Sequence, residues 1–115
     1  MRITLSDFDS PPSEIRDKVV KATVTRRIQR STEGGGAESW VAALDERIKV
    51  KRGDSEFAIS HLVLSDQWVG GHFTPGVTFW PVQLMLVTDS TLLQDELLDP
   101  NKVEYVTWAV ARGVR

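Results

Sequence analysis

The chain of 115 residues contains no cysteine. This absence excludes a disulfide framework, a thiolate zinc site and a cysteine nucleophile, and it fits a reducing compartment. The N-terminal residues also lack the apolar core of a signal peptide, and no stretch approaches the length of a membrane span. We therefore predict a cytoplasmic protein without a membrane segment.

Positive charge is missing between Gly53 and Pro100, where the chain has neither lysine nor arginine. All 14 basic residues lie elsewhere, so the formal net charge of -2 combines an acidic part with a basic part. Charge of one sign on a folded surface attracts partners of opposite sign. The acids of this stretch are Asp54, Glu56, Asp66, Asp89, Asp95, Glu96 and Asp99.

Motifs of common enzymes and cofactor sites are absent as well. The chain has no Walker-type Gly-Lys-Ser/Thr, no Gly-x-Ser-x-Gly and no dinucleotide fingerprint. His61 and His72 frame Asp66, but this spacing matches no metal motif, and we expect a hydrogen-bonded core histidine at 61 and a solvated one at 72. We predict no catalytic residue, no metal and no cofactor; a small barrel with these three side chains in its cavity is the enzyme alternative.

The sequence does contain a series of segments in which apolar and polar residues alternate. A length of 115 residues allows one core, so we predict a single domain over 1–115. Period-two alternation predicts a mainly β fold of five to six antiparallel strands, arranged as a curved sheet, a half-open barrel or a sandwich. The predicted strands cover 18–30, 40–51, 56–65, 77–88 and 102–112, with a short strand near Ile3 and Leu5.

Two of these strands, 56–65 and 77–88, carry large apolar residues on both faces. Such a pattern predicts strands that are covered on both sides. Pro81 has no N–H to donate to a neighbouring strand, so we expect a bulge or a free edge there.

Helical structure is expected in one place and is an alternative in another. A short helix is predicted near 91–98, because Thr91 and Gln94 have the spacing of a capping box. Residues 42–47 fit a helix or a strand, and we favour the strand.

The glycine-rich segment 68–76 contains a tryptophan, a histidine and a phenylalanine. Large aromatic rings in such a loop either anchor a binding interface or cap one end of the barrel, and both alternatives stay open. Together with the nearby acids they favour a non-enzymatic protein-interaction module of inhibitor or immunity type, which docks an acidic surface on a basic protein partner. The predicted partner-binding residues are Asp66, Trp68, His72, Phe73, Asp89, Asp95, Glu96 and Asp99.

The basic part of the chain supports two alternatives. A stripe of cations on one face of the predicted hairpin would suit a phosphate backbone, although the net negative charge and the lack of aromatics among these cations count against nucleic acid. Attraction between basic and acidic surfaces of different copies would instead give a self-assembling homo-oligomer. The five cations of the stripe are Lys21, Arg27, Arg47, Lys49 and Lys51.

Overall fold

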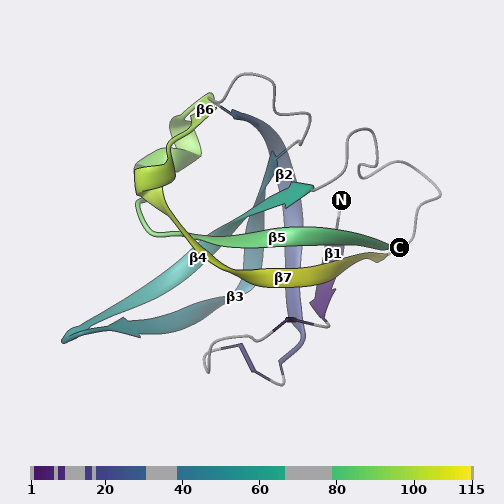
Figure 1. The fold of residues 1–115 in the computed structure, drawn as a ribbon, viewed down its shortest axis with the longest axis horizontal. Coiled ribbons are helices and arrows are strands. Elements are labelled where there is room, and N and C mark those ends of the chain that lie inside the picture. Colours follow the sequence, from purple (N-terminus) through teal and green to yellow (C-terminus); the bar gives the residue numbers. More distant parts are fainter. Residues whose placement is uncertain are drawn as a thin grey trace.

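The computed structural model describes residues 2–6, 8–9, 15–16, 18–30, 39–66 and 79–114. Within these ranges the chain forms seven strands and two short 3₁₀ helices (Figure 1). The mainly β class that the alternation predicts is confirmed. In chain order the elements are β1 (Arg2–Ser6), β2 (Val20–Arg30), β3 (Ser39–Arg52), β4 (Ser55–Asp66), β5 (Phe79–Val87), η1 (Ser90–Gln94), β6 (Leu97–Leu98), η2 (Pro100–Lys102) and β7 (Val103–Val114).

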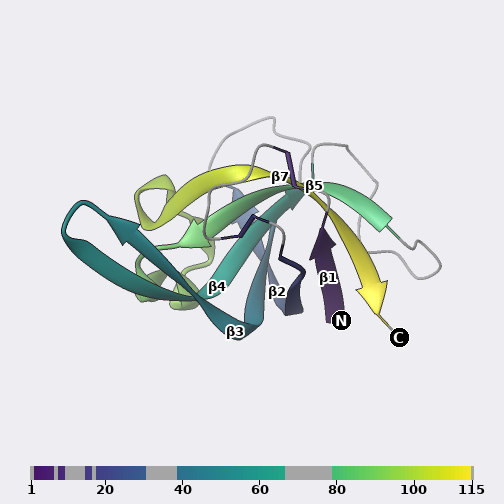
Figure 2. The same cartoon turned by 90° about the horizontal axis from the view of Figure 1, so that it is seen from below.

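Six strands form a closed antiparallel barrel in the order β1, β2, β3, β4, β5 and β7. The barrel closes because β1 pairs with β2 on one side and with β7 on the other. Figure 1 shows β5 and β7 crossing in front of β1 and β2, and Figure 2 shows β1 beside β7. The predicted curved sheet is therefore a complete barrel, with β6 as an additional strand.

Apolar side chains are buried on both faces of this sheet. Leu62 of β4 and Leu84 of β5 belong to the cluster inside the barrel, whereas their neighbours Val63 and Met85 pack outside it, beneath Leu92 of η1. This confirms that β4 and β5 are covered on both sides. The outer cluster consists of Ile28, Val41, Val63, Met85, Val87 and Leu92.

The bulge or free edge expected at Pro81 stays a prediction, because the residues that follow β4 lie outside the described ranges. The last described pair between β4 and β5 joins Asp66 to Val82, so Pro81 lies one residue beyond it. On the other side of β5, Pro81 lies opposite Val110 of β7.

The short helix predicted near 91–98 has different bounds. A 3₁₀ helix covers Ser90–Gln94, and Asp89 caps it in place of the predicted Thr91 capping box. The helix ends at Gln94 because Asp95 has an extended backbone, with φ -83° and ψ 143°. Leu97 and Leu98 then pair in parallel with the end of β2 and form β6.

Residues 42–47 lie in strand β3, as we favour from the sequence, but pairing is irregular there. The pairs with β4 change from Ala43↔His61 to Ile48↔Ile59, so residues 44–47 lie opposite Ser60 alone. Such an insertion bends a strand and increases its twist. Beyond it, β3 and β4 continue as a hairpin that extends away from the other strands in Figure 1.

Candidate functional site

Strands β2 and β3 pair as far as Ala22↔Leu44 and then separate. Beyond this point β2 remains beside β1, where Val20 lies opposite Leu5, whereas β3 leads into the hairpin with β4. The space between the diverging strands is an open groove of about 600 Å³. We call it the basic groove, because cations lie along both of its walls.

One wall of the basic groove is the segment that leads into β2, and the other is the irregular part of β3. Lys18 and Lys21 lie on the first wall, and Arg47 and Lys49 lie on the second. Apolar side chains lie between these charges: Val19 is 63% exposed, whereas Ile15 and Val20 are buried. The groove therefore combines four positive charges with aliphatic surface.

Two carboxylates also line the groove, and one of them is paired with an exposed arginine of β1. Asp45 forms an ion pair with Arg2 of β1, in which Arg2 Nη1 donates to Asp45 Oδ1 at 3.3 Å. The hydrogen bond to Asp45, with the charge of its carboxylate, raises the pKa of Arg2. Among the described residues that line the groove, the exposed Glu46 is then the one carboxylate left to balance the charge of four cations.

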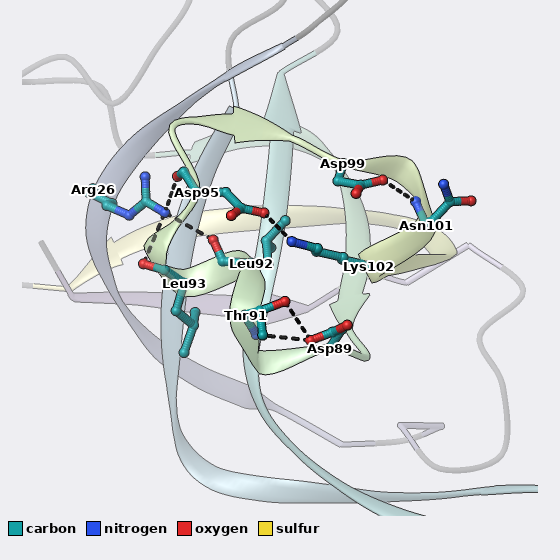
Figure 3. A network of polar contacts seen from close by, with 9 residues as sticks. All are labelled: Arg26, Asp89, Thr91, Leu92, Leu93, Asp95, Asp99, Asn101 and Lys102. Atoms are coloured by element: carbon teal, nitrogen blue, oxygen red, sulfur yellow. Dashed lines mark hydrogen bonds and ion pairs between the residues drawn. The ribbon is translucent and has the colours of Figure 1, made fainter.

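The predicted partner-binding acids of the segment 89–99 lie near the other end of β2, where the structure gives several of them local roles (Figure 3). Asp89 caps η1, since its carboxylate accepts from the Thr91 amide at 3.0 Å and from the Thr91 hydroxyl at 2.7 Å. These two bonds, with a smaller contribution from the charge of Lys102, lower the pKa of Asp89. Asp99 caps η2 in the same way, accepting from the Asn101 amide at 2.9 Å.

Three cations lie among these acids. Lys102 Nζ is 2.7 Å from Asp95 Oδ2, and this hydrogen bond raises the pKa of Lys102. Arg26 of β2 contacts the same turn, and Arg27 lines a smaller groove with Glu96. The acidic surface expected from the sequence is therefore not confirmed, since the fold sets cations from β2 and η2 beside the carboxylates.

The aromatic part of the predicted interface stays a prediction. Trp68, His72 and Phe73 lie outside the described residues, as does the side chain of Asp66, whose backbone ends β4. Whether the 68–76 segment is an interface or a cap of the barrel is therefore untested.

The fold brings together some of the five cations that the sequence suggests as a nucleic-acid-binding stripe. Lys21, Arg47 and Lys49 line the basic groove, whereas Lys51 lies further along the hairpin and Arg27 lies near the far end of β2. Sequence reasoning missed Lys18, because in the predicted strand 18–30 its alternation places it on the face of Val20 and not with Lys21; in the structure Lys18 precedes the first residue of β2.

His61 has the expected hydrogen bond, since its Nδ1 lies 2.8 Å from the Ser60 hydroxyl oxygen, but the residue is half-buried on β4 and belongs to neither core cluster. Burial lowers the pKa of its imidazole. Within the described part of the chain, no cluster of three or more histidine, cysteine, aspartate or glutamate residues is suited to hold a metal ion.

Comparison with protein-family models, curated proteins and solved structures finds no match to this chain. In the described ranges, no helix has the length and apolarity needed to cross a membrane. The functional proposal therefore depends on the basic groove and its charges.

Proposed function

We propose that this chain is a protein-interaction module that binds an acidic partner in the basic groove. The observation that carries the proposal is the convergence of four cations, Lys18, Lys21, Arg47 and Lys49, on one open groove. Its volume of about 600 Å³ falls within the range of about 300–1,000 Å³ found for small-ligand pockets.

The charge expected of the partner follows from which charged side chains of this protein already have a partner. In the described part of the chain, no ion pair joins any of the four groove cations to a carboxylate. By contrast, Asp89 and Asp99 already accept hydrogen bonds from backbone amides near them in sequence, and Asp95 accepts one from Lys102. Cations that have no ion pair with a described residue need not break such a contact when they bind a partner. The groove is therefore better suited to an acidic partner than the acidic segment is to a basic one.

An acidic protein suits this groove better than a nucleic acid does. The described apolar residues that line the groove between the cations are aliphatic and include the exposed Val19 and the partly exposed Ile48, whereas proteins that bind single strands stack bases on aromatic rings. A phosphate-tracking stripe would also need Lys51 and Arg27, which lie outside the groove lining. Short apolar and acidic side chains of a polypeptide match this mixed surface.

Charge reversal tests the proposal directly. We expect the double variant Arg47→Glu/Lys49→Glu to bind a fluorescently labelled, glutamate-rich peptide about tenfold more weakly in an anisotropy titration. The estimate follows because each reversal removes an attraction and adds a repulsion, each worth about 0.2–1 kcal/mol at an exposed site. Binding of the unmodified protein should weaken with rising salt.

Lys51→Glu is the matched control, since Lys51 is an exposed cation on the same strand but outside the groove. It should lose little affinity at moderate salt. An equal loss for Lys51→Glu and Lys49→Glu, or binding that does not respond to salt, would contradict a site in the groove.

A further inference from the structure

We infer that the acidic partner binds as an extended segment that pairs with the free edge of β3 and adds a strand to the sheet. The inference rests on the proposed function and specifies how the partner is held. Its basis is a gap in backbone pairing: the pairs with β2 end at Leu44, and the pairs with β4 resume at Ile48. Residues 45–47 therefore have no strand partner on either side within the described chain.

The gap in pairing coincides with the basic groove. If the register of Ala22↔Leu44 continued, Lys21 would lie opposite Asp45 and Val20 would lie opposite Glu46. These residues do not pair, and they form the two walls of the groove instead. There β2 pairs with β1 on one edge, and no described residue pairs with its other edge, which faces the groove.

An open strand edge presents backbone N–H and C=O groups that need partners. An extended peptide satisfies such groups by strand addition, in which the backbone supplies affinity and alternate side chains supply specificity.

The side chains of β3 along this edge determine which kind of added strand fits best. Side chains of a strand alternate between its two faces, so Lys49 lies on one face and Ile48 and Val50 flank it on the other. Ile48 packs against the core cluster and Val50 is part of it, whereas Lys49 is exposed. A segment in which glutamate alternates with valine would place its acids beside Lys49 and its apolar side chains towards Ile48.

Charge also disfavours an alternative in which the β3 edges of two copies of the protein pair with each other. Lysines on an exposed edge oppose pairing between identical edges, because like charges would lie side by side. Arg47 and Lys49 give the edge along the groove that property. An acidic strand is the partner whose approach these cations favour.

The test compares peptides of one composition, using the intact protein. The probe is an eight-residue peptide of alternating glutamate and valine. Two further peptides carry N-methyl groups, one on the glutamates and one on the valines, so that together they block both edges of the extended segment. At least one methylated peptide should bind about tenfold more weakly than the probe, which corresponds to the loss of about two net hydrogen bonds.

Amide hydrogen exchange gives a second readout. The probe peptide should slow exchange of amides within residues 45–49 and leave the tip of the hairpin, at Gly53 and Asp54, unchanged. Protection at the tip without protection at 45–49 would overturn the inference.

The outcomes separate the inference from the proposed function. If both methylated peptides bind as tightly as the probe, while Arg47→Glu/Lys49→Glu still weakens all three, the groove binds acidic partners but no strand is added. If the double variant binds every peptide as the unmodified protein does, the proposed function fails as well. If a single-stranded oligonucleotide of equal charge binds more tightly than every peptide, the partner is a nucleic acid and both are overturned.

Discussion

Arg26 joins β2 to the turn that covers the outside of the barrel, and replacing it should destabilise the fold. Its Nη2 donates to the carbonyl oxygens of Leu92, Leu93 and Asp95 at 3.2, 3.1 and 2.7 Å (Figure 3). The carbonyls belong to the end of η1 and the residue after it, where an adjacent cation is favourable. Arg26→Met keeps an unbranched aliphatic side chain and removes all three bonds.

The cost follows from these contacts. A hydrogen bond to a charged group contributes about 1.5–3 kcal/mol net, and here one nitrogen serves three acceptors, so we expect a loss of about 2 kcal/mol in the free energy of unfolding. For a domain of 115 residues, that corresponds to a fall in Tm of roughly 8 °C. Urea denaturation followed by circular dichroism measures the loss, with thermal unfolding as the second assay.

Lys21→Met is the matched control, because Lys21 is an exposed cation on the same strand. An exposed substitution of this kind should change stability by less than about 0.5 kcal/mol. Equal losses for the two variants would refute the argument that the three carbonyl contacts stabilise the turn. Arg26→Met should also leave binding of acidic peptides unchanged, since Arg26 does not line the basic groove.

Three further predictions concern stability. Leu92→Ala should cost about 3–4 kcal/mol in urea denaturation, because Leu92 is fully buried in the outer cluster. Gly53→Ala should cost about 1 kcal/mol in the same assay, because Gly53 has a φ of 60° at the hairpin turn. The folded pKa of Asp89 lies below its ordinary value of 3.8, so its contribution is complete above that pH and is lost as pH falls through the folded pKa. Asp89→Asn, which retains an N-cap, should therefore show a shallower loss of stability in acid titrations below about pH 4.

Much of the barrel could be predicted because its strands are long and its two clusters leave a clear pattern. Apolar residues on both faces of 56–65 and 77–88 correctly indicate an inner and an outer cluster. The short elements could not be predicted in the same way. η1 and β6 depend on the cap at Asp89 and on pairing with Gln29 and Arg30, which are distant in sequence.

The candidate site is harder to predict from the sequence, because the position of the groove and the placement of the charges both depend on residues that are distant in sequence. The basic groove exists where β2 and β3 stop pairing after Ala22↔Leu44, and no local pattern marks that point. The lack of lysine and arginine between Gly53 and Pro100 indicates an acidic surface, yet Arg26 and Lys102 approach this segment from outside it. The fold therefore brings cations from β2 and η2 to this segment, which a count of charges along the sequence does not reveal.

The most direct test of the central claim locates the acidic partner on the protein. Two-dimensional ¹H–¹⁵N NMR spectra, recorded during titration with the alternating glutamate–valine peptide, report which amides respond. The account predicts that the largest shift changes fall within 18–21 and 44–49, on the two walls of the basic groove. Shift changes centred on the 89–102 segment or the hairpin tip, with these walls unaffected, would contradict it.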